Sequence, residues 1–430
     1  MKRICTIGKL GFFGAWLLAL PLLLAGDWPQ WRGVERNGQS SDTGLLKEWP
    51  ENGPPLVYSA SGVGKGYSSL SLSDGLIFTM GDIDSAQYVV ALRAEDGSSA
   101  WKTRVGPPWP DQYVGARSTP TVDGDRLYAL GTEGDLVCLR KSDGQELWRR
   151  NLKEDFGGHL MIIQNTNWKY AESPLVDGNK VVVTPGGPQA AMVALNKMTG
   201  EEIWRTAVPD LGEKGADGAA YSSIVISNGA GVKQYVQLMG RGVVGVDAET
   251  GRFLWGYNRV ANDVANITTP IVEGDYVFAS TGYRTGAALL KLSKEGSGVK
   301  AEEVYFLEAN VMQNHHGGII LHNGYLYTGT GHNRGYPLCV EMTSGEVAWG
   351  PIRNDGEGSA AVSYADGNLY MRYQNGLMML VEATPQEYRE KGSFTIPNVN
   401  QFSWSHPVVS GGRLYLREQD NLHVYDISAP

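Results

Sequence analysis

The chain has 430 residues, with 37 basic and 46 acidic side chains and a formal net charge of −9. This acidic balance argues against a nucleic-acid partner, because proteins that bind nucleic acids present basic surfaces. Glycine supplies 56 residues, well above the usual share of about 7%, and no heptad or low-complexity tract occurs. We therefore expect a globular chain that is rich in tight turns.

Residues 1–26 are expected to form a signal peptide. Three basic residues accompany an uncharged apolar run from Leu10 to Ala25, which is the order of a secretory signal. Leu23 stands where the cleavage site prefers a small residue, so retention as an uncleaved anchor stays open, although the run is shorter than the roughly 20 residues of a membrane span. We expect an exported protein, periplasmic or extracellular, that touches a membrane only through an uncleaved leader.

Residues 27–53 form a separate Trp-rich segment, which we call the strap. It opens with DWPQWRGVERNG and brings two Trp, one Pro and two Arg close together. We expect the strap to pack its Trp pair on the repeat domain that follows, either against the side of that domain or across one of its mouths.

Residues 54–430 repeat one pattern with a period of about 45 residues. In the copy at residues 118–148, short apolar runs alternate with turns at Asp123-Gly124 and Asp143-Gly144, and the copy ends on Trp148. Gly supplies the positive φ of a tight hairpin and Asp tolerates it, so these turns separate four short strands. Four strands in about 45 residues are typical of one β-propeller blade.

Eight copies can be counted on the first turn, whose glycines are Gly75, Gly124, Gly178, Gly229, Gly274, Gly324, Gly367 and Gly411. Five copies end on a Trp, whereas those ending near Tyr305 and Tyr388 lack it and are interpreted as degenerate. We expect the Trp side chains in the core, so that Trp148→Ala costs about 3–5 kcal/mol. The predicted fold class is all-β: an eight-bladed β-propeller of four-stranded antiparallel blades, closed into a ring with few free edges.

Closure of the ring needs a clasp, because the last copy stops at Ile427 without an outer strand of its own. Leu56–Ser59 is predicted to supply that strand, so the propeller is closed by an N-terminal strand. We expect the closed ring to be a monomer.

A binding site is expected at the axis of the ring, where the innermost strands can be aligned on the turn glycine. Residues six and eight positions before it share one face of a strand. The position six before is small in seven copies, and Glu172 is its one ionisable member. The predicted axial residues, with sequence neighbours included, are Tyr67, Arg117, Tyr170, Glu172, Tyr221, Asn266, His316 and His406.

Glu172 and His316 are the candidate catalytic residues. Glu172 with Asn266 offers carboxylate and amide oxygens, which suit Ca²⁺, or it acts as a general base. Alternatively, Glu172 forms an ion pair with Arg117 of the preceding blade or accepts a capping hydrogen bond.

His316 and its neighbour His315 could hold a transition metal or act as a base. Adjacent residues of a strand point to opposite faces, so the pair is not expected to chelate one ion, and the alternative is one packed and one solvated imidazole. Tyr67, Tyr170 and Tyr221 either stack on a planar ligand, such as a quinone or a sugar, or pack between blades.

Three features together resemble the pyrroloquinoline-quinone (PQQ)-like repeat propellers: the A-x-x-x-x-TG-x-x-x-W ending at residues 194–204, the opening DWPQWRG, and the eightfold count. The resemblance covers residues 27–430. The superfamily includes quinoprotein alcohol dehydrogenases, which hold PQQ and Ca²⁺ at the ring axis. It also includes cofactor-free BamB-like outer-membrane assembly proteins, which use the disc as a binding scaffold.

The sequence departs from the dehydrogenases of that superfamily. It has no adjacent Cys pair, no C-x-x-C-H haem motif, and His316 and Ser359 where a catalytic Asp would be expected. The favoured hypothesis is a non-catalytic binding scaffold without a cofactor, which presents a propeller face to a protein or carbohydrate partner. The alternative is a PQQ- and calcium-dependent alcohol dehydrogenase, with Glu172, Asn266, Arg117 and His316 around the cofactor.

Overall fold

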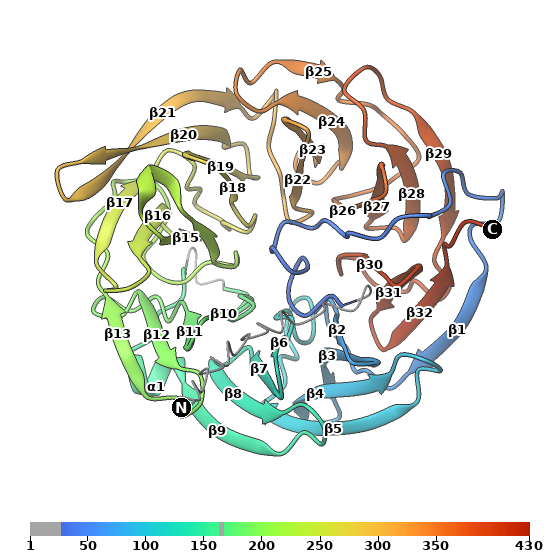
Figure 1. Cartoon of the computed structure of the whole chain (residues 1–430), viewed down its shortest axis with the longest axis horizontal. Coiled ribbons are helices and arrows are strands. Elements are labelled where there is room, and N and C mark those ends of the chain that lie inside the picture. The colour runs from blue at the N-terminus through green and yellow to red at the C-terminus, as the bar shows by residue number, and fades with distance from the viewer. Residues whose placement is uncertain (1–26, 163–166) are drawn as a thin grey trace, which may run out of the picture.

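The computed structural model describes residues 27–162 and 167–430. The predicted signal peptide lies outside the described residues. Within the described part of the chain, eight four-stranded antiparallel sheets surround a central axis (Figure 1). This arrangement confirms the predicted eight-bladed β-propeller. No helix in the described ranges combines the length and apolar character needed to cross a bilayer.

The first four blades follow the chain in order, and each runs from the axis to the circumference. Blade 1 comprises β2 (Ser71–Ser73), β3 (Leu76–Ile83), β4 (Ala86–Arg93) and β5 (Ser99–Gly106). Blade 2 comprises β6 (Thr121–Asp123), β7 (Arg126–Leu130), β8 (Asp135–Arg140) and β9 (Glu146–Asn151), followed by the short helix α1 (Leu152–Phe156). Blade 3 comprises β10 (Leu175–Asp177), β11 (Lys180–Val183), β12 (Met192–Asn196) and β13 (Glu202–Thr206). Blade 4 comprises β14 (Val225–Ser227), β15 (Gln234–Met239), β16 (Gly242–Asp247) and β17 (Phe253–Tyr257).

The remaining blades complete the ring. Blade 5 comprises β18 (Ile271–Glu273), β19 (Tyr276–Thr281), β20 (Gly286–Glu295) and β21 (Gly298–Glu308). Blade 6 comprises β22 (Ile319–His322), β23 (Tyr325–Thr330), β24 (Tyr336–Glu341) and β25 (Val347–Trp349). Blade 7 comprises β26 (Ala360–Ala365), β27 (Asn368–Tyr373), β28 (Leu377–Glu382) and β29 (Glu390–Thr395). Blade 8 comprises β30 (Val408–Ser410), β31 (Arg413–Glu418), β32 (Asn421–Asp426) and β1 (Leu56–Ser61).

The outer strand of blade 8 comes from the start of the repeat domain, as predicted. β1 pairs antiparallel with β32, with Ser59 opposite His423. The turn predicted at Asn228-Gly229 differs from its counterparts: it is a longer loop that contains the 3-10 turn η1 (Gly229–Gly231). The five residues between Asn228 and Gln234 are too many for a two-residue hairpin, and the positive φ values are at Ala230 and Gly231 rather than at Gly229.

Aromatic side chains join each of several blades to the next one. Trp148 donates Nε1–H to the carbonyl oxygen of Lys197 at 3.0 Å. Its ring covers Gly200, where an added Cβ would lie 2.9 Å from the indole. Tyr305 makes the equivalent contact in blade 5, donating to the carbonyl oxygen of Met342 at 2.6 Å. The copy with Tyr305 is therefore not degenerate in this respect, because tyrosine replaces tryptophan at the same contact.

The ring closure uses the same contact. Tyr58 of β1 donates its hydroxyl to the carbonyl oxygen of Ala94 in blade 1 at 2.9 Å and packs over Gly97. Trp148 is only partly buried, whereas Trp255 is 4% exposed. The prediction that the blade tryptophans are all core residues is therefore wrong for Trp148 and for Trp101, which are only partly buried, although both pack against core clusters.

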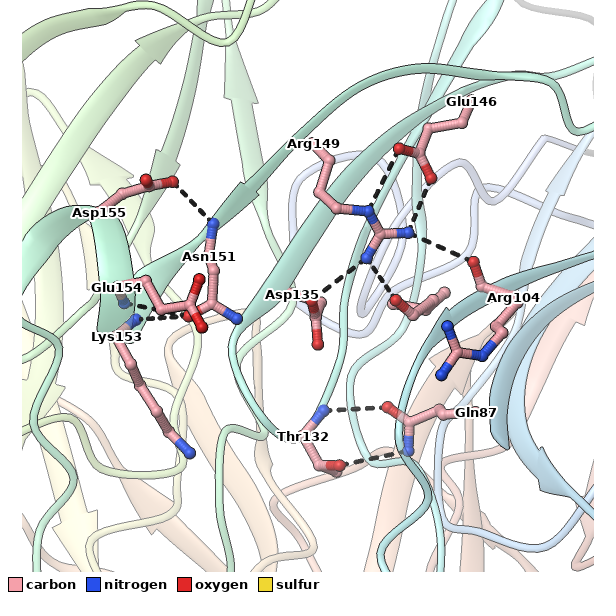
Figure 2. A network of polar contacts seen from close by, with 11 residues as sticks. Gln87, Arg104, Thr132, Asp135, Glu146, Arg149, Asn151, Lys153, Glu154 and Asp155 are labelled. Carbon is pink, nitrogen blue, oxygen red and sulfur yellow. Dashed lines mark hydrogen bonds and ion pairs between the residues drawn. The ribbon is translucent and has the colours of Figure 1, made fainter. Parts of the chain in front are cut away.

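Polar contacts add to the boundary between blades 1 and 2 (Figure 2). Arg149 of β9 forms ion pairs with Asp135 at 3.2 Å and Glu146 at 2.7 Å, and reaches the carbonyl oxygens of Arg104 and Val105 in β5. Gln87 accepts a hydrogen bond from the backbone N–H of Thr132 at 2.9 Å. The Arg149 side chain is 34% exposed, so solvent screens these ion pairs.

Buried arginines join blade 8 to both of its neighbours. Arg372 of β27 donates to Glu418 of β31 at 2.7 Å, and the two side chains are 0% and 1% exposed. Ser403 bonds to both of them, at 2.9 Å from Nε of Arg372 and 2.6 Å from Glu418. Arg417 donates to the carbonyl oxygens of Gly64 and Ser68, which precede blade 1.

The strap crosses one end of the ring (Figure 1, dark blue). Trp28 forms a β-bridge with Leu72 of blade 1, and Gln39 forms one with Tyr364 of blade 7. Arg36 donates to the carbonyl oxygens of Ser173 and Pro174, which lead into blade 3. The strap therefore contacts blades on several sides of the axis and covers one mouth of the propeller.

Candidate functional site

A cavity of about 240 Å³ lies on the propeller axis. Three tryptophans and four tyrosines line it: Trp31, Trp168 and Trp404, with Tyr67, Tyr113, Tyr221 and Tyr283. The imidazoles of His315, His316 and His406 and the guanidinium groups of Arg32 and Arg117 complete much of the wall. No Asp or Glu of the described residues is part of this lining. The site is thus an aromatic cavity with cationic but no anionic side chains.

The strap closes one end of the cavity. The Trp31 ring lies 4.6 Å from the ring of His406, and its Nε1–H donates to Oγ1 of Thr269 at 3.3 Å. Arg32 is 3% exposed and donates to the carbonyl oxygens of Asn37 at 2.9 Å and Ile319 at 2.5 Å. These contacts fix two strap residues in the floor of the cavity.

The opposite end is marked by exposed aromatic rings. Tyr113 and Phe402 line the cavity and are 36% and 40% exposed. Phe402 stacks on Trp404 with ring centroids 4.9 Å apart and planes at 18°, and Tyr113 lies 4.8 Å from the same Trp404 ring. Tyr113 and Phe402 also contact each other, with ring centroids 5.9 Å apart. The three rings therefore form one cluster, which marks the end of the cavity away from the strap.

Much of the wall is built from irregular segments that precede the first strand of a blade, and the strap and the loops that hold Tyr283, Asn333 and Gln374 complete it. His315 and His316, for example, precede β22 and lie outside any strand. Without the strand's period of two, consecutive residues can face the same space. Both histidines line the cavity, with ring centroids 4.4 Å apart. The prediction that these two side chains point to opposite faces is therefore wrong.

Some of the predicted axial residues come together in this cavity. Tyr67, Arg117, Tyr221, His316 and His406 all line it. Arg117 donates to the backbone carbonyl oxygens of Gly115 at 3.0 Å and Tyr113 at 2.7 Å. The structure does not form the suggested ion pair between Arg117 and Glu172.

Two further predicted residues serve packing and loop structure. Tyr170 is 1% exposed and donates its hydroxyl to the carbonyl oxygen of Pro185 at 2.9 Å, within the core between blades 2 and 3. The amide of Asn266 donates to the carbonyl oxygens of Met239 and Gly240 and accepts from the backbone N–H of Asn262. Neither residue lines the cavity.

Glu172 is also absent from the cavity wall among the described residues, although Ala171 and Ser173 on either side are part of it. Its carboxyl is 2% exposed, and Oε2 accepts a hydrogen bond from the backbone N–H of Thr184 at 2.8 Å. Burial raises the pKa of Glu172 to about 8, against the opposing effects of the Thr184 hydrogen bonds and the positive charge of Arg36. Glu172 is thus mainly protonated at neutral pH.

The histidines of the wall are neutral at neutral pH. Nδ1 of His315 lies 2.7 Å from Oγ of Ser359, and its Nε2 lies 2.9 Å from the Tyr283 hydroxyl. Burial lowers the pKa of His315, and it lowers the pKa values of His316 and His406 to about 3. Over the described ranges, no cluster of three or more His, Cys, Asp or Glu side chains is placed to hold a metal ion.

The sequence of the chain matches a known protein family. Residues 85–350 match the PQQ_2 family model, which is described as outer membrane protein assembly factor BamB. The chain belongs to the PQQ_2 family. It is 26% identical to outer membrane protein assembly factor BamB of Kangiella koreensis over 226 residues, 51% of this chain and 49% of that protein. It is also 29% identical to the putative dehydrogenase XoxF of Paracoccus denitrificans over 109 residues, 24% of this chain and 18% of that protein. The chain thus matches half or less of the length of these curated relatives.

Solved structures of PQQ_2-like propellers share the fold. BamB from Moraxella catarrhalis superposes with a TM-score of 0.59 at 14% identity, covering 86% of this chain and 97% of that one. Quinohemoprotein alcohol dehydrogenase from Comamonas testosteroni superposes with a TM-score of 0.63 at 12% identity, covering 94% and 81%. At these identities the likeness establishes the fold alone.

The residues around the axis of this PQQ_2 chain do not fit a calcium-held quinone. Ca²⁺ takes six to eight oxygen ligands, carboxylates prominent among them. The described lining has no carboxylate. Asn266 donates to Met239 and Gly240, and its Oδ1 accepts from Asn262. Oε2 of Glu172 accepts from Thr184, and Oε1 is buried without a hydrogen-bond partner, outside the cavity lining. The aromatic wall can stack on a planar ring, but the ligands for the ion are missing from it.

Sequence reasoning missed several residues of the wall. Trp31 and Arg32 were assigned to the strap without a role at the axis, and Tyr113, Tyr283 and Phe402 lie in loops outside the aligned positions. The one available signal was the density of aromatic residues just before the inner strands, as in residues 402–404. The repeat alignment could not use it, because these loops differ in length from blade to blade.

Proposed function

We propose that this PQQ_2 chain is an exported, non-catalytic binding module that receives its partner at the open end of the axial cavity. The observation that carries the proposal is the composition of the cavity: stacked aromatic rings and two arginines, without an acidic side chain among the described residues. Such a wall offers contact surface and hydrogen-bond donors. It offers no carboxylate that could act as a base or hold a metal.

The family match and the predicted leader both support an exported binding module. BamB relatives carry the name of outer membrane protein assembly factors, which is a role in assembly rather than in a chemical step. The predicted leader at residues 1–26 supports export. Cell fractionation, followed by the mass of the mature N-terminus, tests that part. A chain that keeps Met1 and is found in the cytoplasm contradicts export.

The partner site is tested with cavity and control variants. Wild type and Trp404→Ala are used to capture partners from an envelope extract and to probe a glycan array. Leu147→Ala is the control, because Leu147 is 37% exposed on the outer strand β9, far from the axis. Binding that Trp404→Ala loses and Leu147→Ala keeps supports the proposal. Equal binding by both variants contradicts it, provided that both unfold at the wild-type denaturant midpoint.

The alternative function is the PQQ- and calcium-dependent dehydrogenase, favoured by the sequence likeness to the putative dehydrogenase XoxF. The test incubates the purified protein with PQQ and Ca²⁺, followed by gel filtration and dye reduction with primary alcohols. We expect no retained quinone absorbance and no dye reduction. Retained quinone that reduces the dye would replace the binding-module proposal with the enzyme.

A further inference from the structure

Two cations line the axial cavity without a carboxylate partner among the described residues. Arg32 is 3% exposed; its Nη2 donates to two carbonyl oxygens, while Nε and Nη1 have no partner. Arg117 donates only to backbone carbonyl oxygens. Buried cations in proteins are usually paired with an anion. The described lining therefore holds two positive charges and no negative one, in a chain whose net charge is −9, although the charge of Asp82 also acts on the half-buried Arg117.

The wall also contains buried polar groups that lack a hydrogen-bond partner. They are Nε1 of Trp168, Nε2 of His316 and Nδ1 of His406. Nε2 of His406 lies 3.0 Å from the carbonyl oxygen of His316, so in the neutral ring Nε2 carries the proton and Nδ1 is an acceptor. A ligand that satisfies this set brings both hydroxyl donors and acceptors.

The aromatic rings give the ligand its shape. Tyr67 and Trp404 have centroids 4.8 Å apart with planes at 38°, and Phe402 extends the Trp404 surface toward the open end. A cavity of about 240 Å³ accommodates one six-membered ring with its substituents. A longer chain would extend past the ring cluster of Tyr113, Phe402 and Trp404.

We propose that the axial cavity binds the terminal sugar of an acidic carbohydrate, with its carboxylate in the field of Arg32 and Arg117 and its ring against the aromatic wall. This inference rests on the proposed function, because it assumes that the cavity is the binding site. An aromatic acid without a ring hydroxyl would supply the charge and a flat face, but it brings no hydroxyl donor for Nδ1 of His406. A uronic acid supplies the charge, an apolar ring face and several hydroxyl donors.

Isothermal titration with short oligomers of glucuronate, galacturonate and mannuronate, each paired with its methyl ester, tests the inference. The ester keeps the ring and hydroxyl groups and removes only the charge. For at least one sugar, we expect the acid to bind about tenfold or more tightly than its ester, the preference of a charged hydrogen bond over a neutral one. The preference should decline as salt is raised.

Arg117→Gln is the test variant, and Arg389→Gln is its matched control. Arg389 carries the same charge on the outer side of blade 7, with its side chain 46% exposed. We expect Arg117→Gln to reduce the preference for the acid about tenfold or more while the ester still binds, and Arg389→Gln to leave both affinities unchanged. Acid and ester that bind equally to the wild type overturn the inference.

The two proposals can fail separately. If no uronate binds but a captured partner still requires Trp404, the proposed binding function is supported and the proposal of an acidic sugar ligand is wrong. Preferential binding of a peptide that ends in an aromatic residue and a free carboxylate would also overturn the sugar. If Trp404→Ala leaves uronate binding unchanged, the cavity is not the binding site. Both the proposed function and the inference that rests on it are then wrong.

Discussion

Glu172→Gln should change how the stability of the propeller depends on pH. Burial raises the pKa of this carboxyl from 4.5 to about 8. Since the folded-state pKa lies above the unfolded-state value, the folded chain binds the additional proton between pH 4.5 and about 8, and stability falls as pH rises through that window. The pKa difference of about 3.5 corresponds to about 5 kcal/mol, at about 1.4 kcal/mol for each unit.

A glutamine keeps the size and the acceptor for the Thr184 N–H but never ionises. We expect wild type and Glu172→Gln to have similar unfolding free energies near pH 4.5, and the variant to be more stable by about 3–5 kcal/mol at pH 9. Urea denaturation followed by tryptophan fluorescence, repeated between pH 4.5 and 9, measures both curves. Parallel curves would refute the reasoning. So would a wild type that Ca²⁺ stabilises and a variant that it does not, because Glu172 would then be an ionised calcium ligand.

Three further substitutions test the contacts between blades by urea denaturation. Glu418→Ala is expected to cost about 3–5 kcal/mol, because Arg372 stays buried without its counter-charge; a loss below about 1 kcal/mol would mean that water reaches the pair. Arg149→Ala is expected to cost about 0–1 kcal/mol despite its many contacts, since solvent screens a side chain that is one-third exposed; a loss as large as that of Glu418→Ala would contradict this. Trp148→Ala is expected to cost about 2–3 kcal/mol, below the range for a fully buried tryptophan, and a loss above about 4 kcal/mol would restore the sequence-based expectation.

The architecture could be predicted because its signals are local and repeated. The turns at Asp123-Gly124 and its counterparts need left-handed backbone at a fixed place in each hairpin, and Gly124 has φ +59°. The missing outer strand of the last copy predicted the role of β1. Tyr305 could not be recognised as a tryptophan substitute, since only the coordinates show that its hydroxyl reaches Met342.

The site was harder to predict, because it lies where the repeat loses its regular geometry. A period of two assumes a strand, but the segments that hold Glu172, Asn266 and His316 are irregular. Glu172 consequently turns toward Thr184, whereas His315 and His316 both face the axis. The strap adds Trp31 and Arg32 from a part of the chain that the alignment of repeats does not include.

The pairing of β1 with β32 has a consequence for how the protein folds. Leu56–Ser61 is synthesised before all the other blade strands, whereas its partner Asn421–Asp426 follows them. The early strand therefore keeps an unpaired edge until the blades between the two segments have been synthesised. Long-range pairings of this kind slow folding. They also leave incomplete chains with unpaired strand edges that favour aggregation. A chain truncated before Asn421, which lacks β32, should accordingly aggregate rather than fold as a shorter propeller.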